Sequence, residues 1–301
     1  MTKARKGIYA AAISPFTEDY RLDCSKLVNY CSYLLNDGGC DGIAPIGTTG
    51  EGASVSIDDR LKLPKLFFKA NIPADRVIIG TGNPSTPDAA RLSKAALEYG
   101  YVNQLVLPPF YYKSVGDDGL YDYFSYMIKT INSENLRIYL YHFPQVSMVP
   151  ISVDLVLRLK NEFGPIIAGL KDSSGDFSQS LAFTKATGGI NQGFDVYPSS
   201  EAFYFKGIQT GCAGIISGST NVFATLVQAA INSPEGPKSN EFKKVIEARS
   251  FVGEFNLMAA MKAAEAKRTA DETWERLAPP LQKLNKEDKQ KLYDGLSKIF
   301  A

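Results

Sequence analysis

The sequence predicts an α/β fold, a (β/α)8 barrel of the TIM-barrel type followed by a C-terminal helical extension. Short apolar segments alternate with amphipathic segments of helical length, and eight such units lie before residue 234. No strand-like segment follows. The 301 residues are enough to bury a large core. We therefore expect residues 1–233 to form the barrel and residues 234–301 to pack on it as helices.

The eight strand candidates are short and rich in Ile, Val, Leu, Tyr or Ala. Most are apolar on both faces, which is typical of a parallel sheet covered by helices. They are 9–14, 42–47, 76–80, 104–107, 138–142, 166–171, 195–197 and 212–217. A doubly wound open sheet is the alternative. The first strand–helix junction lacks a G-x-G-x-x-G loop, which disfavours a dinucleotide-binding version of that sheet.

The segments between the strands carry apolar residues at helical spacing. The segment 152–163 also opens with Ser152, a residue type favoured at helix N-caps. The other helical candidates named here are 24–35, 87–99, 200–211 and 221–231. After residue 233 we expect two or three helices and a loop near 277–280.

Composition excludes several classes of partner. The chain has 33 Lys and Arg against 32 Asp and Glu, so no net field attracts nucleic acid or an anionic membrane. No segment approaches the ~20 apolar residues of a membrane span. Residues 1–13 superficially imitate a signal peptide, but the apolar run is short and lacks a clear cleavage pattern, so we interpret it as the first strand.

Four scattered cysteines without a C-x-x-C pair indicate buried thiols in a reducing compartment, and we expect a cytoplasmic protein. The single histidine, His142, argues against a His-based metal site and against a Ser-His-Asp triad. We therefore expect neither a metal nor an organic cofactor.

Lys171 closes an apolar run that begins at Pro165, and a Ser/Gly turn follows it. This pattern predicts a strand whose last side chain is an amine at the edge of an apolar core, where desolvation favours the neutral, nucleophilic form. Such an amine is suited to forming a Schiff base with a carbonyl substrate. The alternative is a lysine that merely extends from a strand end into solvent.

Tyr141 ends the preceding strand candidate, 30 residues before Lys171, which is one strand–helix unit. Neighbouring parallel strands are ~4.8 Å apart, so phenol and amine should share the mouth of the barrel. A tyrosine there is a reasonable proton carrier for imine chemistry. The alternative is a core tyrosine bound to a backbone group.

The turn after the second strand, Gly47 to Glu51, offers the hydroxyls of Thr48 and Thr49 and the flexible backbone of Gly50. Fixed donors in such a turn can bind a small carboxylate. The alternative is an ordinary turn, and we assign Glu51 no chemistry. Ile216, in the last strand candidate, completes the substrate-binding set. Three other residues at strand ends are candidates for binding the hydroxyls of a sugar: Ser199, Ser200 and Ser217. The simpler interpretation is that they are turn and helix-cap residues.

Three motifs together resemble the dihydrodipicolinate synthase/N-acetylneuraminate lyase family in order and spacing. They are Gly47-Thr48-Thr49-Gly50-Glu51, Tyr141-His142-Phe143-Pro144 and Gly169-Leu170-Lys171-Asp172. The segment 108–113 is also similar to the aromatic segment that follows the fourth strand in that family. The resemblance covers essentially the whole chain, the helical extension included.

The resemblance implies that Lys171 forms an imine with pyruvate or another 2-oxo acid and that Tyr141 relays protons. It implies that Thr48 and Thr49 hold the carboxylate or relay protons. It further implies a homo-oligomer, a homotetramer, in which a tyrosine after the fourth strand reaches a neighbouring subunit's site. We assign that role to Tyr112 in preference to Tyr111.

Two residues of this chain differ from the usual pattern of that family and bear on the reaction. Val146 stands where the synthases have an arginine for the carboxylate of aspartate semialdehyde, and valine cannot make that contact. Thr48 stands where neuraminate lyases usually have serine. We therefore expect a class I lyase or aldolase that cleaves or condenses a 2-keto-3-deoxy acid with an aldehyde. The alternatives are a dihydrodipicolinate synthase, a 2-oxo acid dehydratase or deaminase, and, remotely, a non-catalytic binding protein.

Overall fold

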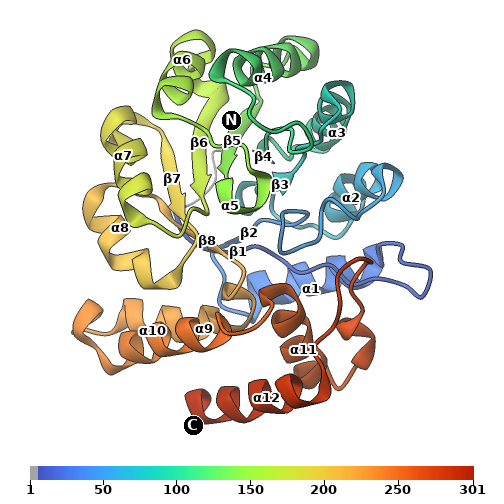
Figure 1. The fold of residues 1–301 in the computed structure, drawn as a ribbon, viewed down its shortest axis with the longest axis vertical. Helices are drawn as coiled ribbons and strands as arrows, with labels where there is room; N and C mark the ends of the chain where they lie inside the picture. The colour runs from blue at the N-terminus through green and yellow to red at the C-terminus, as the bar shows by residue number, and fades with distance from the viewer. Residues whose placement is uncertain (1–5) are drawn as a thin grey trace.

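Eight short parallel strands form a barrel in the computed structural model, which describes residues 6–301 (Figure 1). They are β1 (Gly7–Ala10), β2 (Gly42–Ile43), β3 (Ile79–Gly80), β4 (Asn103–Val106), β5 (Arg137–His142), β6 (Ile167–Asp172), β7 (Asp195–Pro198) and β8 (Gly214–Ser217). Backbone hydrogen bonds from Ile78 to Ile43 and from Ala213 to Val196, both 2.9 Å, join the two runs of paired strands. The predicted barrel is confirmed.

Every predicted strand segment contains or overlaps an observed strand, but the bounds differ. In the predicted segment 42–47 the strand covers only the first two residues, and Ala44 and Pro45 add one backbone hydrogen bond each before the chain turns at the barrel mouth. The predicted segment 76–80 contains β3, and a 3-10 turn at Ala74–Arg76 precedes that strand.

The outer layer consists of α1 (Cys24–Asn36), α2 (Ile57–Lys69), α3 (Thr86–Glu98), α4 (Asp117–Ile131), α6 (Val153–Phe163), α7 (Phe177–Thr187), α8 (Tyr204–Thr210) and α9 (Thr220–Asn232). A short helix, α5 (Pro144–Ser147), follows β5. Ser152 caps α6 as predicted, since its hydroxyl accepts a 3.0 Å hydrogen bond from Leu155 N. Three of these helices, α2, α4 and α7, were not identified individually from the sequence.

Large aromatic side chains fill the barrel interior. The ring of Tyr197 lies 5.6 Å from that of Tyr9 and 6.0 Å from that of Tyr139, centroid to centroid. Gly42 and Gly169 make room for these rings, because a Cβ at either position would overlap a tyrosine ring. The interior is therefore a packed core.

The alternation of side chains breaks within β6. Ile167 and Leu170 pack outward against the helices, whereas Ala168 packs in the interior and a Cβ on Gly169 would point at the interior ring of Tyr139. The register with β5 shifts at the same place. This irregularity has the form of a β-bulge, and it turns the next side chain after Leu170, that of Lys171, toward the barrel axis.

His142 lies on the outer face of β5, opposite to Tyr141. Its ring packs edge-on against Phe183 at 5.4 Å, and its Nδ1 accepts a 3.0 Å hydrogen bond from Ile151 N. Burial lowers the pKa of His142 below its ordinary value near 6.5, and the carboxylate of Asp172 opposes that shift. The histidine is thus a neutral structural acceptor.

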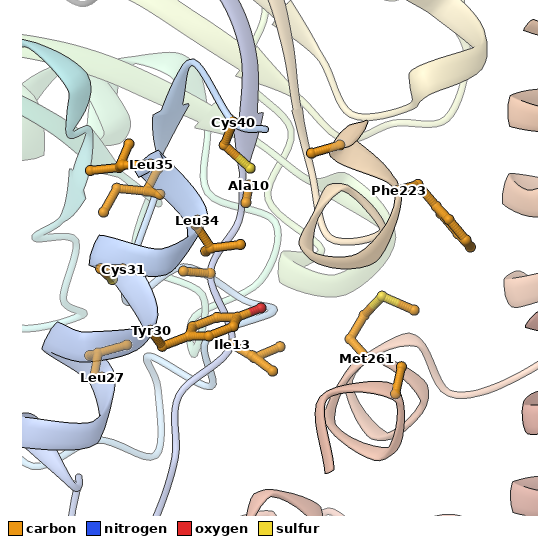
Figure 2. Close-up of a cluster of buried hydrophobic side chains, with 14 of the residues drawn as sticks. Ala10, Ile13, Leu27, Tyr30, Cys31, Leu34, Leu35, Cys40, Phe223 and Met261 are labelled. Atoms are coloured by element: carbon orange, nitrogen blue, oxygen red, sulfur yellow. The ribbon is translucent and has the colours of Figure 1, made fainter. Parts of the chain in front are cut away.

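Three further helices pack on the side of the barrel where α1 and α9 lie, at the bottom of Figure 1: α10 (Asn240–Val252), α11 (Leu257–Thr269) and α12 (Lys286–Phe300). This agrees with the helices expected after residue 233. Figure 2 shows Met261 of α11 across from the apolar side of α1, whereas Phe223 of α9 points away from α1, and its ring lies 5.8 Å from that of Phe300 of α12. Met261, Phe223 and the apolar residues of α1 belong to one buried cluster.

A buried ion pair joins this extension to the barrel. Lys262 of α11 contacts Glu51 of the turn after β2, and both side chains are fully buried. Ala278 N donates a 2.8 Å hydrogen bond to Glu51 Oε2, and Lys262 Nζ donates to Arg276 O at 2.6 Å. Burial lowers the pKa of Lys262 to about 8, against the opposing effect of Glu51. Glu51, to which we assigned no chemistry, is a structural anchor.

All four cysteines are free thiols. Cys31, Cys40 and Cys212 are buried and Cys24 is half-buried, so the expectation of buried thiols holds for three of them. Within residues 6–301 no helix is long and apolar enough to cross a membrane.

Replacing one partner of the Glu51–Lys262 pair should lower the stability of the fold much more than replacing both. Lys262→Met leaves a buried carboxylate unpaired, and we expect the free energy of unfolding to fall by about 3–5 kcal/mol. Glu51→Gln/Lys262→Met removes both charges and should recover most of that loss. Chemical denaturation of the three proteins measures this. A Lys262→Met protein as stable as the parent would contradict the role of this ion pair as a structural anchor.

Acid should destabilise the fold through His142. The unfolded chain binds a proton at the ordinary histidine pKa and the folded chain only at lower pH, so the free energy of unfolding falls as pH drops below about 6.5. Because His142 is the single histidine, NMR of the tag-free protein follows its ring directly. His142→Asn, which keeps an acceptor, should flatten the stability profile between about pH 6.5 and 5. An imidazole that titrates at or above 6.5 would contradict this account.

Candidate active site

Lys171 and Tyr141 meet at the mouth of the barrel. They are register partners in the parallel pair β5–β6, and Lys171 Nζ donates a 3.3 Å hydrogen bond to Tyr141 Oη. The amine lies 4.4 Å from the centroid of the same ring, and Lys171 is only 3% exposed. The structure therefore brings together the two side chains that the 30-residue spacing placed side by side.

Thr48 extends this contact to a third element. Tyr141 Oη donates a 3.1 Å hydrogen bond to Thr48 Oγ1, in the turn after β2. Amine, phenol and hydroxyl thus form one hydrogen-bonded array across the mouth. Such an array can move a proton between the amine and a group bound near Thr48.

The turn that carries Thr48 is held in an unusual backbone conformation. Ile46 and Glu51 have positive φ angles of 60° and 51°, which side chains of this size rarely adopt. Gly50 packs so closely on the segment after β1 that a Cβ would lie 2.7 Å from Ala12 O, and Ser14 Oγ donates to Gly50 O at 2.6 Å. These contacts, with the buried anchor Glu51, fix the turn.

Thr49 faces the turn that follows β8. It is 8% exposed, and a Cβ on Gly218, just after β8, would lie 2.9 Å from Thr49 Oγ1. Ile216 of β8 is fully buried in the interior cluster that also contains Tyr141. The predicted substrate-binding residues thus come from the turn after β2 and from β8, the two strands that flank β1.

Tyr111 and Tyr112 lie elsewhere, on the loop between β4 and α4. They are 76% and 72% exposed, and their rings meet edge to face at 5.4 Å. Within residues 6–301 of one chain, this loop does not bring either tyrosine into the Lys171 array. Val146 is also exposed, on α5 just beyond β5.

Sequence reasoning missed a buried carboxylate behind the mouth. Glu201 is fully buried, and its oxygens accept hydrogen bonds from Ser219 Oγ at 2.8 and 3.0 Å and from Thr220 Oγ1 at 2.7 Å. The hydroxyl of Ser217 joins this network through Ser219 at 3.1 Å. The sequence signal that could have pointed to Glu201 is its position shortly after the strand candidate 195–197.

A groove of about 390 Å³ lies beside this network. Its lining includes Ser199 and Ser200 after β7 and Gly175 after β6, together with Arg249, Ser250 and Glu254 from α10 and the residues that follow it. No sequence pattern pointed to Arg249, because it belongs to the extension. Within the described part of the chain, no cluster of three or more His, Cys, Asp or Glu side chains could hold a metal ion.

Comparison with known proteins agrees with this geometry. The model of the dihydrodipicolinate synthetase family matches residues 4–298. An uncharacterized DapA-like lyase of Chloroflexus aurantiacus is 31% identical, over 98% of this chain and 97% of the relative. A crystal structure of dihydrodipicolinate synthase from Agrobacterium tumefaciens has a TM-score of 0.88 at 31% identity, covering 99% of this chain and all of the other.

Proteus mirabilis N-acetylneuraminate lyase shares the fold, with a TM-score of 0.83 at 22% identity over 99% of both chains. The family resemblance inferred from the three motifs is confirmed, and enzymes of this family are Schiff-base lyases and synthases. The chain belongs to the dihydrodipicolinate synthetase family and is a class I, pyruvate-dependent lyase or synthase.

Proposed function

We propose that the protein cleaves, or reversibly forms, a 2-keto-3-deoxy acid through an imine between Lys171 and pyruvate. The observation that carries this proposal is the buried array of Lys171, Tyr141 and Thr48. A largely desolvated amine that touches a phenol is the arrangement that imine formation requires, since a proton must leave the nitrogen and water must leave the carbon.

In this mechanism Lys171 Nζ adds to C2 of the 2-oxo acid, and Tyr141 transfers a proton to the oxygen so that the carbinolamine loses water. The phenolate of Tyr141 that remains then takes the proton of the C4 hydroxyl, and the iminium accepts the electron pair of the C3–C4 bond, which releases the aldehyde and leaves an enamine. Protonation of that enamine at C3 and hydrolysis return the free amine and pyruvate. Condensation is the reverse sequence.

The substrate carboxylate is assigned to the turn of Thr48, Thr49 and Gly50. The hydroxyl of Thr48 already contacts Tyr141 at 3.1 Å, so a carboxylate bound there lies next to the proton carrier. The constrained backbone of this turn, with its positive φ angles on both sides, keeps the donors in place before substrate arrives.

Condensation with aspartate semialdehyde is the second candidate, since the similar Agrobacterium protein is a dihydrodipicolinate synthase. Against it stands exposed Val146, which offers the second carboxylate no partner.

We also propose a cytoplasmic homotetramer in which Tyr112 reaches a neighbouring subunit's site. Two large aromatic rings at 72% and 76% exposure are unusual on a free surface and suit an interface. Four free thiols suit a reducing compartment.

Borohydride reduction in the presence of pyruvate should place a reduced pyruvyl adduct on Lys171 alone, located by peptide mass spectrometry. Lys171→Ala should give no adduct, because no other amine sits in the array. Lys129→Ala, at an exposed position of α4, is the matched control and should be labelled like the parent. Labelling that survives in Lys171→Ala would refute the imine assignment.

Tyr141→Phe should slow proton transfer while leaving Lys171 in place. We expect exchange of the pyruvate methyl protons with deuterium oxide, which reports the imine–enamine step without any aldehyde, to fall by about 10²- to 10⁴-fold. NMR of pyruvate measures this rate. Tyr126→Phe, half-exposed on α4, is the control. A rate within twofold of the parent would remove Tyr141 from the relay.

The role of Tyr112 is testable by mixing subunits. Lys171→Ala and Tyr112→Phe are each inactive or slow, but co-assembled equally they should regain about a quarter of the parental exchange rate per site if the tyrosine acts in trans. Tyr111→Phe mixed in the same way tests the neighbouring ring. No gain over the separate variants would exclude action across subunits.

A further inference from the structure

Glu51 closes the turn that carries Thr48 and Thr49. Its backbone N donates a 2.9 Å hydrogen bond to Thr48 O, so both threonines lie within one tight turn. The φ angle of Glu51 is 51°, which is unfavourable for a long side chain unless other contacts hold the residue there. Whatever fixes the side chain of Glu51 therefore also fixes the two threonines.

The polar contacts of the Glu51 carboxylate come from the helical extension. Lys262 of α11 contacts one oxygen, and Ala278 N donates a 2.8 Å hydrogen bond to the other. Both members of the ion pair are fully buried, so solvent does not screen the attraction. Within residues 6–301, Lys262 is the one cation that pairs with Glu51.

Lys262 is itself held in place. Its Nζ donates a 2.6 Å hydrogen bond to Arg276 O and lies 4.6 Å from the centroid of the Phe16 ring. The guanidinium of Arg276 donates to Phe16 O at 2.7 Å. The amine is therefore a fixed point to which the carboxylate of Glu51 is attached, rather than a flexible side chain that follows it.

Helix α11 also lies beside the other side of the turn. A Cβ on Gly218 would lie 2.9 Å from both Thr49 Oγ1 and Leu257 Cδ2, so Thr49 and Leu257 lie against the same point after β8. Leu257 is the first residue of α11, and Lys262 follows five residues later. One helix thus borders the turn at Thr49 and at Glu51.

We propose that Lys262 is a positioning residue for the substrate carboxylate: through Glu51 it holds Thr48 and Thr49 where that carboxylate binds. This inference rests on the proposed function, because the carboxylate of the imine-bound acid is taken to lie at this turn. Lys262 acts through Glu51 and does not itself contact the substrate. A residue that only anchors the fold would change its stability alone, whereas a positioning residue also changes which ligand the site prefers.

The test compares pyruvate with methyl pyruvate, which has the same 2-oxo group but an uncharged ester in place of the carboxylate. Half-maximal borohydride trapping at Lys171 is measured for both compounds by mass spectrometry, and the ratio of the two concentrations gives the preference for the carboxylate. We expect Lys262→Met, assayed where circular dichroism shows it folded, to lose about tenfold of the parental preference, because its turn no longer keeps the donors in place. The loss should come from weaker trapping of pyruvate, with methyl pyruvate little changed.

Glu51→Gln/Lys262→Met separates positioning from stability. This variant should recover most of the stability that Lys262→Met loses, because no buried charge is left unpaired. It should not recover the preference for pyruvate, since a neutral amide beside a methionine restores no charged contact to the turn. The double variant also decides the question if Lys262→Met fails to fold.

Glu275→Gln/Lys289→Met is the matched control. It removes a second lysine–glutamate pair of the extension, 2.8 Å long, which joins the segment Glu272–Glu275 to α12, and it should keep the parental preference. Equal trapping of the two compounds by the parent, a parental preference in Glu51→Gln/Lys262→Met, or an equal loss in the control would each overturn the inference. If the parent protein does not trap pyruvate, the proposed function itself fails instead.

Discussion

The chemistry at the mouth depends on one irregularity in the pairing of β5 with β6. Ile138 pairs with Ile167, but Tyr139 pairs with Gly169, so β6 contains one extra residue at this point. With regular pairing from Ile138 onward, Tyr141 would oppose Leu170, and Lys171 would follow the outward face of the strand. The shift places the amine of Lys171 against the phenol of Tyr141 inside the barrel. Because Gly169 has no side chain, it leaves room for the ring of Tyr139 beside it.

The second constraint is the fixation of the turn after β2. Its backbone has left-handed residues at Ile46 and Glu51, a conformation that persists only where the surroundings enforce it. The enforcement comes from Ser14 and from the buried pair between Glu51 and Lys262. Because Lys262 belongs to α11, the helical extension takes part in holding Thr48 next to Tyr141. The extension therefore supports the site from behind.

The sequence was sufficient for the barrel and for the Lys171–Tyr141 pair, for the same physical reason. Strand–helix units of regular length place consecutive strand ends side by side, so a spacing of one unit becomes a contact. Strand bounds were less accurate, as in 42–47, because apolar residues continue past the last paired residue into the turn. The partner of Glu51 and the position of Arg249 could not be predicted, since contacts between distant helices leave no local pattern. The roles of Tyr111 and Tyr112 stay predictions, because both side chains lie on the surface of one chain.

A crystal structure of the protein soaked with pyruvate tests the central claim most directly. Our account predicts continuous density from Lys171 Nζ to C2 of the ligand. The ligand's carboxylate should lie against the turn of Thr48 and Thr49. Tyr141 Oη should lie within hydrogen-bond distance of a polar group bonded to the imine carbon. Pyruvate bound without a covalent link, or linked with its carboxylate turned away from that turn, would contradict the account.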